Sequence, residues 1–259
     1  METPQITLFL VYSGTQSAPL LPSNSRARSL DHSFERQKPV SPRTVPPESP
    51  MRTHDSSDPD HIAAVLSEFG LPSLSAQQTA AFESYLEILL RWNSRTNLTA
   101  IRDPQGIIRR HFVECIACAR LLPEEISSLL DFGSGAGFPG IPIAVCRPTL
   151  SVTLAESQNK KAAFLHEAVR TLQLRVAVFA GRAESISTRF DCVTLRAVDQ
   201  MNGAIQAASS MLRPNGWLAV MTTKDHRDEI AIVAGANFSW TAIQLYGSEQ
   251  QILLLGRRN

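Results

Sequence analysis

The segment LLDFGSGAGFPG, residues 129–140, decides the fold that we predict for this chain. An aliphatic run followed at once by glycines indicates a buried strand that leads into a loop. Glycine reaches positive φ without strain and lets a ligand approach the backbone, because it has no Cβ. A tight turn alone would need some of the same residues, but this density of glycine favours a ligand-binding loop. Four glycines fall within eight positions: Gly133, Gly135, Gly137 and Gly140.

The chain beyond about residue 123 alternates between strand-like and helix-like segments. This alternation predicts parallel strands joined by right-handed helical crossovers, a doubly wound α/β sheet. The last two strand-like segments are joined by a short link, which favours an antiparallel hairpin at the sheet edge. After the first strand, the strand-like segments are SVTLAE (151–156), RVAVFAG (175–181), FDCVTLRA (190–197), GWLAVMT (216–222), FSWTAIQLY (238–246) and QQILLLG (250–256).

The α/β domain is predicted to span residues 123–259. The chain before it is predicted to have two parts. Nine of the 16 prolines fall before residue 60, with little apolar periodicity, so residues 1–57 are expected to be a disordered N-terminal extension. A second hypothesis is that translation starts at Met51. Residues 58–122 carry three helix-like segments with capping signals and apolar stripes, which are expected to form a helical N-terminal cap.

The composition favours a soluble protein of the reducing cytoplasm. The formal net charge is +1. Four cysteines are too few for a fold of 259 residues that depends on disulfide bonds. No stretch has the length and apolarity of a membrane span. Cys115 and Cys118 form a C-x-x-C pair one turn after His111, but no second pair exists. We therefore expect both cysteines to be buried in the cap and predict no metal site.

The glycine loop matches two nucleotide-binding patterns. GAGFPG, residues 135–140, fits the dinucleotide fingerprint G-x-G-x-x-G, so a nicotinamide or flavin enzyme has to be considered. Glu156 ends the second predicted strand, where its carboxylate can accept hydrogen bonds from the ribose hydroxyls of either kind of cofactor. The longer string D-x-G-x-G-x-G, residues 131–137, resembles the first motif of S-adenosylmethionine-dependent methyltransferases with a Rossmann-like fold.

Six motifs, one of which contains the glycine loop, together narrow the resemblance to one family. From about Ser84 to Gly216 the chain resembles the ribosomal RNA small subunit methyltransferase G family, also called glucose-inhibited division protein B. The resemblance implies that a methyl group passes from S-adenosylmethionine to N7 of one guanine in the 16S rRNA of the small ribosomal subunit. The motifs are RWNSRTNLTAIRDP (91–104), RRHFVE (109–114), LLDFGSGAGFPGIPIA (129–144), ESQNKKAAFL (156–165), GRAES (181–185) and FDCVTLRAV (190–198).

The resemblance implies that the cofactor touches five residues, which are Gly133, Phe138, Ala183, Glu184 and Arg196. A charge at the end of a buried-looking strand is costly without an anionic partner, and for Arg196 that partner is either the cofactor or a structural ion pair. The chain departs from the family in two places. MTTKDH (221–226) replaces the usual Lys-Gly pair, and Val198 stands where Phe is common, so both changes bear on the guanine pocket.

Guanine N7 carries a lone pair and no proton, so we expect no catalytic base and predict catalysis by positioning. The RNA phosphates are expected to meet an arginine-rich stretch of the cap, whose members could also only solvate helix faces. The RNA-binding candidates are Arg91, Arg95, Asn97, Arg102, Arg109, Arg110 and Arg182. Three alternatives stay open: methylation of another substrate, a nicotinamide-dependent oxidoreductase, and a non-catalytic cofactor-binding protein.

Overall fold

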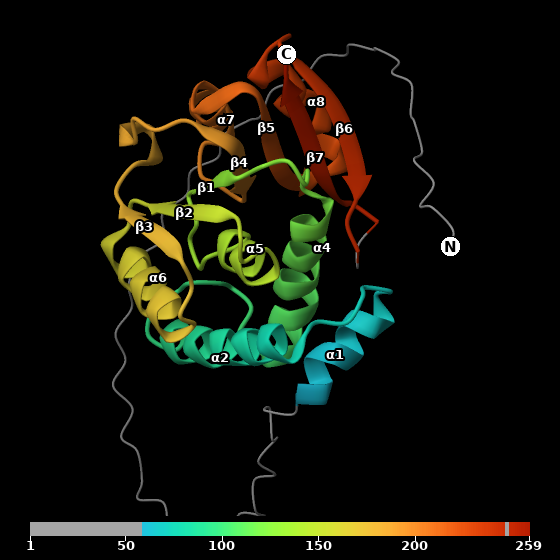
Figure 1. Cartoon of the computed structure of the whole chain (residues 1–259), viewed down its shortest axis with the longest axis vertical. Coiled ribbons are helices and arrows are strands. Elements are labelled where there is room, and N and C mark those ends of the chain that lie inside the picture. Colours follow the sequence, from blue (N-terminus) through green and yellow to red (C-terminus); the bar gives the residue numbers. More distant parts are fainter. Residues whose placement is uncertain (1–58, 247–248) are drawn as a thin grey trace, which may run out of the picture. The chain divides into compact units, whose positions relative to one another are not determined.

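The computed structural model describes residues 59–246 and 249–259, which belong to one compact unit (Figure 1). The predicted extension, residues 1–57, and the alternative start at Met51 lie outside the described residues. A seven-stranded sheet forms the centre of the unit. Its strands are β1 (Ser128–Phe132), β2 (Ser151–Glu156), β3 (Val176–Ala180), β4 (Phe190–Arg196), β5 (Leu212–Thr223), β6 (Phe238–Gln244) and β7 (Gln251–Arg258).

The strand order is β3-β2-β1-β4-β5-β7-β6. The first five strands of this order are parallel, while β7 pairs antiparallel with both β5 and β6. The prediction of a doubly wound, mostly parallel sheet with an antiparallel edge hairpin is therefore confirmed. The chain moves outward from β1 to β3 and then returns to β4 on the other side of β1. Ligands bind at such a switch point, beside the carboxyl ends of the strands.

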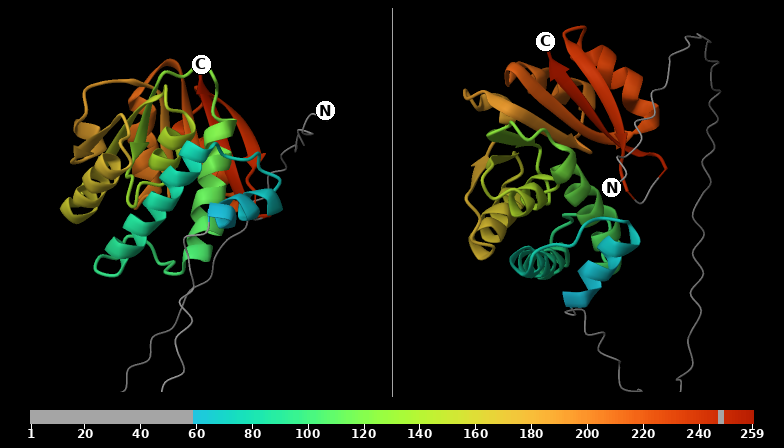
Figure 2. Two further views of the ribbon diagram at one scale, coloured as in Figure 1. Left: turned by 60° about the horizontal axis from the view of Figure 1, so that its bottom comes forward. Right: turned by 45° about the vertical axis from the view of Figure 1, so that its right-hand side comes forward.

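Helices cover both faces of the sheet (Figure 2). The alternating side chains of each strand point to opposite faces, so Leu129 packs on one side and Leu130 on the other. The first face is covered by α5 (Gly140–Cys146) and α6 (Asn159–Thr171) together with helices of the cap. The second face is covered by α7 (Met201–Ser210) and α8 (Arg227–Ala234). Two short 3-10 turns, η2 (Ala183–Ser185) and η3 (Lys224–His226), complete this part of the chain.

The cap contains α1 (Pro59–Glu68), α2 (Ala76–Asn93), α3 (Pro104–Ile107) and α4 (Val113–Leu121). One of the capping signals is a capping box at the start of α2, where Ser75 and Gln78 are bonded to each other's backbone N–H groups. Cap side chains such as Tyr85 and Phe112 are fully buried in the same core as the first face of the sheet. The cap is thus fixed to the α/β domain by a shared core.

The third predicted helix is interrupted by a π-helical turn, η1 (Ile108–Phe112), between α3 and α4. In a π-helical turn the backbone hydrogen bonds join residues five apart, and such turns often occur at functional sites. This turn carries Arg110 and His111, which both reach the site described below. The cysteines that follow it, Cys115 and Cys118, are buried as predicted, and burial raises the pKa of Cys115 to about 12.

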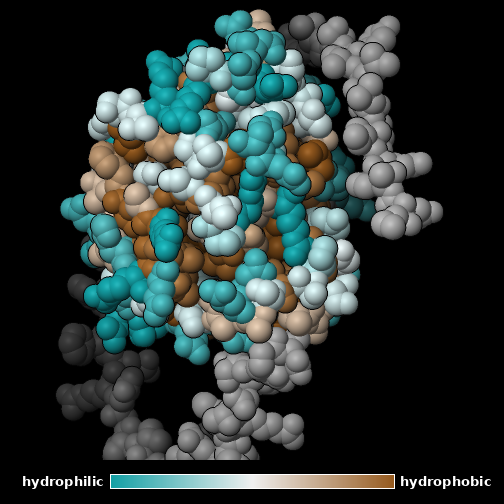
Figure 3. Space-filling model, in the orientation of Figure 1, coloured by the Kyte–Doolittle hydropathy of each residue, from teal (hydrophilic) through white to brown (hydrophobic). Residues whose placement is uncertain are grey.

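The surface is mixed in polarity. Figure 3 shows hydrophobic residues visible between hydrophilic ones on the face that Figure 1 presents. Among the described residues, the exposed large hydrophobic side chains are those of Ile232 and Tyr246. None of the helices in residues 59–246 and 249–259 has the length and apolarity that a membrane crossing requires.

Candidate active site

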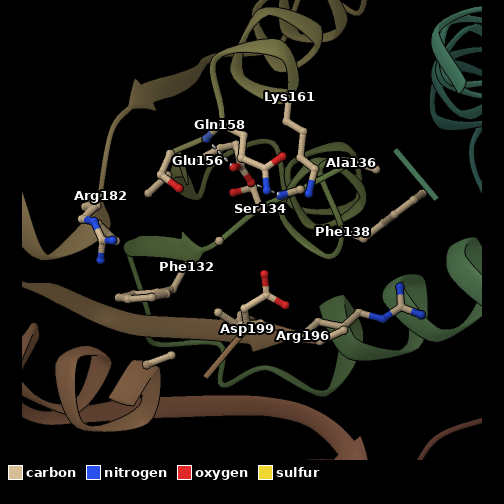
Figure 4. Close-up of a pocket in the computed structure, with 18 of the residues that line it drawn as sticks. Phe132, Ser134, Ala136, Phe138, Glu156, Gln158, Lys161, Arg182, Arg196 and Asp199 are labelled. Carbon is tan, nitrogen blue, oxygen red and sulfur yellow. Dashed lines mark hydrogen bonds between the residues drawn. The ribbon is translucent and has the colours of Figure 1, made fainter. Parts of the chain in front are cut away.

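A cavity of about 660 Å³ opens where the carboxyl ends of β1, β2 and β4 meet, at the switch point of the sheet (Figure 4). Its walls come from the glycine loop, from the ends of β2 and β4, from η2 and from the cap. The volume is in the usual range for a small-molecule or cofactor site. Most of the predicted cofactor residues line it, which are Gly133, Gly135, Phe138, Glu156, Ala183, Glu184 and Arg196.

The glycines of the loop fall into two groups. Gly133 and Gly135 line the cavity with φ of +71° and +56°, and a Cβ on Gly135 would meet no atom closer than 3.9 Å. Gly137, with φ of +89°, is not among the lining residues. Its Cβ would lie 2.5 Å from Ile141 Cδ1 and 2.8 Å from Tyr85 Oη. Gly137, one of the glycines of the predicted ligand-binding loop, thus packs closely against α5 and the cap, and its prediction as a cofactor contact stays a prediction.

Asp131, near the end of β1, connects the glycine loop to β4 through hydrogen bonds. Its carboxylate is buried and accepts hydrogen bonds from Thr194 Oγ1 at 2.9 Å and from the Gly140 N–H at 3.1 Å. Burial raises the pKa of Asp131 to about 6, although these hydrogen bonds act in the opposite direction. The residue does not line the cavity, so it shapes the start of α5 and leaves ligand contact to other groups.

Glu156 lines the cavity, and backbone hydrogen bonds hold its carboxylate in place. Its Oε2 accepts from the Gly135 N–H at 2.9 Å, and its Oε1 accepts from the Gln158 N–H at 2.8 Å. The side chain is buried, although it stands at the end of a strand, where a carboxylate is often exposed to solvent. Because each carboxylate oxygen has two acceptor positions, both oxygens keep capacity for a ligand hydroxyl group. The fixed carboxylate is thus suited to a ribose diol.

Arg196 lines the cavity with its stem, while its guanidinium turns toward the cap (Figure 4). Nη2 donates to Glu114 Oε2 at 2.6 Å and to the Arg110 carbonyl at 3.0 Å. The guanidinium carbon also lies 5.8 Å from the centre of the Phe138 ring. The anionic partner that the buried strand end required is therefore present within the chain, as Glu114.

His111, which had no predicted role, joins this network. Arg196 Nη2 donates to His111 Nδ1 at 3.1 Å, since a guanidinium has no acceptor, and His111 Nε2 lies 2.9 Å from Thr99 Oγ1. Burial, and then the Arg196 charge, lowers the pKa of His111 to about 3. The ring is therefore neutral near pH 7. His111 and Thr99 both line the cavity, so the cap forms part of its wall.

The predicted RNA-binding residues lie in different surroundings. Arg91 is ion-paired with Glu167, and Arg109 Nη2 lies 2.6 Å from Glu68 Oε2. Arg102 donates to Asn97 Oδ1 at 2.9 Å, which holds the loop between α2 and α3. Three other arginines, Arg95, Arg110 and Arg182, have exposed side chains, and Arg182 also lines the cavity.

Several cavity residues were not predicted from the sequence. Lys161 extends from α6 toward the glycine loop, and Asp199 points into the open space after β4 (Figure 4). Asp199 lies between Ala197 and Gln200, which both hold positive φ, at +49° and +53°. Non-glycine residues with positive φ are concentrated at functional sites. The motif ESQNKK contained a signal for Lys161, whereas the backbone of residues 197–200 could not be read from the sequence.

The described residues contain no cluster of three or more His, Cys, Asp or Glu side chains suited to a metal ion. The groups that line the cavity include a carboxylate bonded to the loop backbone, two glycines with positive φ, and the aromatic side chains of Phe132 and Phe138. Such a set fits a nucleoside with an attached polar chain.

Comparison with known proteins extends the motif evidence. The model of the family described as rRNA small subunit methyltransferase G matches residues 78–247. A ribosomal RNA small subunit methyltransferase G from Xanthomonas campestris pv. campestris (strain B100) is 42% identical over 177 residues, 67% of this chain and 82% of the relative. The protein of that name from Xanthomonas oryzae pv. oryzae (strain KACC10331 / KXO85) is 40% identical over 192 residues, 73% of this chain and 88% of the relative.

Solved structures support the fold. A methyltransferase from Pyrococcus furiosus superposes with a TM-score of 0.51 at 13% sequence identity, covering 67% of this chain and 95% of that chain. At this identity the likeness concerns the fold alone. The predicted methyltransferase type of Rossmann-like fold is confirmed.

Proposed function

Because the chain belongs to the rRNA small subunit methyltransferase G family, we propose that it transfers a methyl group from S-adenosylmethionine to N7 of one guanine in 16S rRNA. The observation that carries the proposal is the cavity at the switch point, where the Glu156 carboxylate accepts from the backbone of Gly135 in the glycine loop. The family match favours this function over a nicotinamide-dependent oxidoreductase.

The cavity fits the proposed cofactor group by group. The Glu156 carboxylate would accept hydrogen bonds from the ribose hydroxyls, and the backbone of Ala183 and Glu184 would read the adenine edge. Gly135, where a Cβ would meet no atom closer than 3.9 Å, leaves room for the amino-acid end beside the loop. When bound, S-adenosylmethionine supplies an electrophilic methyl group on a cationic sulfur.

The residues of the chain would act by position and charge. Guanine N7 needs no proton removed, so holding the reacting atoms in line is the main contribution, which can supply ~7–11 kcal/mol. The purine becomes cationic on methylation, so a strongly positive pocket would oppose the reaction. Glu114 offsets the charge of Arg196, and His111 is neutral near pH 7 because its pKa is lowered to about 3. These features support a site without excess positive charge.

The proposed partner is the rRNA of the small ribosomal subunit, in the cytoplasm. Exposed arginines of the cap and of the cavity rim, Arg95, Arg110 and Arg182, would contact phosphates and orient the RNA. A guanine in a loop or bulge is easier to unstack and to present to a cavity than one within a duplex.

The experiment is methyl transfer from labelled S-adenosylmethionine to small-subunit particles from bacterial cells that lack the corresponding gene. We expect label in the 16S rRNA and none in the ribosomal proteins. Naked 16S rRNA, assayed in parallel, shows whether assembly is required. Label in protein or in small molecules alone would favour the runner-up, a methyltransferase with another substrate. Binding of NADH in place of S-adenosylmethionine would contradict the cofactor.

A further inference from the structure

A second cavity, of about 680 Å³, lies beside the first. It is formed by the ends of β4 and β5 together with α7, α8 and Gln251 of β7. Arg196, Ala197, Gln200 and Gly203 line both cavities, so residues 197–200 stand between them. A ligand in the second cavity would therefore sit next to a ligand in the first.

The walls of the second cavity suit a flat molecule with a polar edge. Met221 and Ile230 are buried side chains that offer apolar surface. Thr222 and Thr223, which lie in the segment that departs from the family's usual Lys-Gly pair, add hydroxyl groups without a charge. Flipped nucleobases are held in this way, with apolar contacts to the ring faces and hydrogen bonds to the edge.

Glu229 supplies a carboxylate at the open side of this cavity, where its side chain is 55% exposed and has one hydrogen bond across to α7. Asn202 Nδ2 donates to Glu229 Oε1 at 2.9 Å, from α7 to α8. His226 Nδ1 lies 3.7 Å from Glu229 Oε2. Both residues also line the cavity. An ionised carboxylate accepts only, so its free positions select a ligand edge that carries donors side by side.

Guanine has such an edge, with the N1–H and N2–H groups adjacent, whereas adenine pairs an acceptor at N1 with a donor at N6. We propose that the second cavity receives the target guanine and that Glu229 accepts hydrogen bonds from its Watson–Crick edge. This inference rests on the proposed function, and it assigns base selection to a residue outside the cofactor cavity. N7 lies on the opposite edge of the purine and stays free to face the first cavity.

The charge of the second cavity agrees with this assignment. Two arginines, Arg110 and Arg196, and two glutamates, Glu114 and Glu229, line it, so the formal charges cancel when histidine is counted as neutral. A guanine that becomes cationic at N7 would therefore meet no net positive charge. The exposed Arg110 is available to an RNA phosphate, while Arg196 is engaged by Glu114.

The test compares Glu229→Gln with wild type on two substrates, small-subunit particles that carry guanine or adenine at the methylated position. A glutamine amide offers one acceptor and one donor, which mismatches guanine and matches adenine. We expect kcat/KM on the guanine particle to fall roughly 10- to 100-fold and the guanine-to-adenine ratio to fall with it. The calorimetric Kd of S-adenosylmethionine should not change.

The control is Asp228→Asn, which removes the neighbouring carboxylate on α8 that does not line the cavity. This variant should keep the wild-type rate and ratio. An unchanged ratio in Glu229→Gln, whether the rates stay the same or fall equally on both particles, would overturn the inference. If wild type transfers no methyl group to the guanine particle, the proposed function itself is contradicted, a result distinct from failure of Glu229 alone.

Discussion

Arg196 Nη2 lies 2.6 Å from Glu114 Oε2, so a buried ion pair ties the end of β4 to the cap helix α4. The two side chains are only 15% and 4% exposed. Burial raises the pKa of Glu114, while the Arg196 charge acts in the opposite direction. The pair connects both cavities to the cap, because Arg196 lines each of them.

Removal of one partner of this pair is expected to destabilise the protein. Glu114→Gln leaves the Arg196 charge in a largely buried position, and breaking a buried pair costs about 3–5 kcal/mol. The matched control is Glu68→Gln, which breaks the exposed pair with Arg109 and should cost less than about 1 kcal/mol. Urea unfolding of the two variants measures both free energies. Equal losses would contradict the structural role of the Arg196–Glu114 pair.

His111 is expected to make the protein acid-labile. Its pKa is lowered from 6.5 to about 3 in the folded state, so the unfolded chain binds a proton first as the pH falls. Its contribution to stability is complete above pH 6.5 and is lost toward pH 3, at up to ~1.4 kcal/mol per pH unit. His111→Gln should weaken the pH dependence of the unfolding free energy between pH 3 and pH 6.5. The control, His166→Gln, changes an exposed histidine and should leave this dependence as in wild type. Identical pH profiles for wild type and His111→Gln would refute the assignment.

Substitution of a glycine inside the glycine loop is expected to differ in effect from an equally strained substitution outside it. Gly135→Val places a branched side chain in the cofactor cavity and should abolish S-adenosylmethionine binding in a folded protein. Gly70→Val imposes similar backbone strain, at φ of +63°, in open space away from the cavity. Calorimetry should show normal affinity for the Gly70 variant. Unchanged affinity in folded Gly135→Val would remove the cofactor from this loop.

The exposed arginines are expected to set the salt dependence of RNA binding. Arg95→Ala and Arg110→Ala should each weaken binding to the small-subunit particle and lower the log–log salt slope by at most about one. The control is Arg175→Ala, which removes an exposed arginine that directly precedes the edge strand β3. Arg91 and Arg109 should contribute less, since each already has an acidic partner. Equal slopes for wild type and the Arg95, Arg110 double variant would exclude this surface.

The sequence predicted the fold well because its signals are local. The order of strands and helices, the capping box at Ser75 and the glycine loop all depend on residues close together in the chain. Local reasoning could not show how Gly137 packs, because its neighbours Tyr85 and Ile141 come from the cap and from α5. A long-range contact decides whether a glycine serves a ligand or a packed side chain.

The electrostatics of the site could not be predicted in the same way. Arg196 was expected to need an anion, but its partner Glu114 lies 82 residues earlier and reaches it from α4, directly after the π-helical turn. The arginine-rich stretch was identified from charge alone, whereas the partners of Arg91 and Arg109 come from α6 and α1. Pairing across the tertiary structure determines which of these charges are available to RNA.

The central claim is tested most directly by identifying the methylated nucleoside. Small-subunit particles from cells that lack the gene are incubated with the protein and S-adenosylmethionine, and the 16S rRNA is digested and analysed by mass spectrometry. The account predicts one 7-methylguanosine per 16S rRNA, which is absent when Gly135→Val replaces wild type. A methyl group at an exocyclic amine, at a ribose hydroxyl or at several guanines would contradict it.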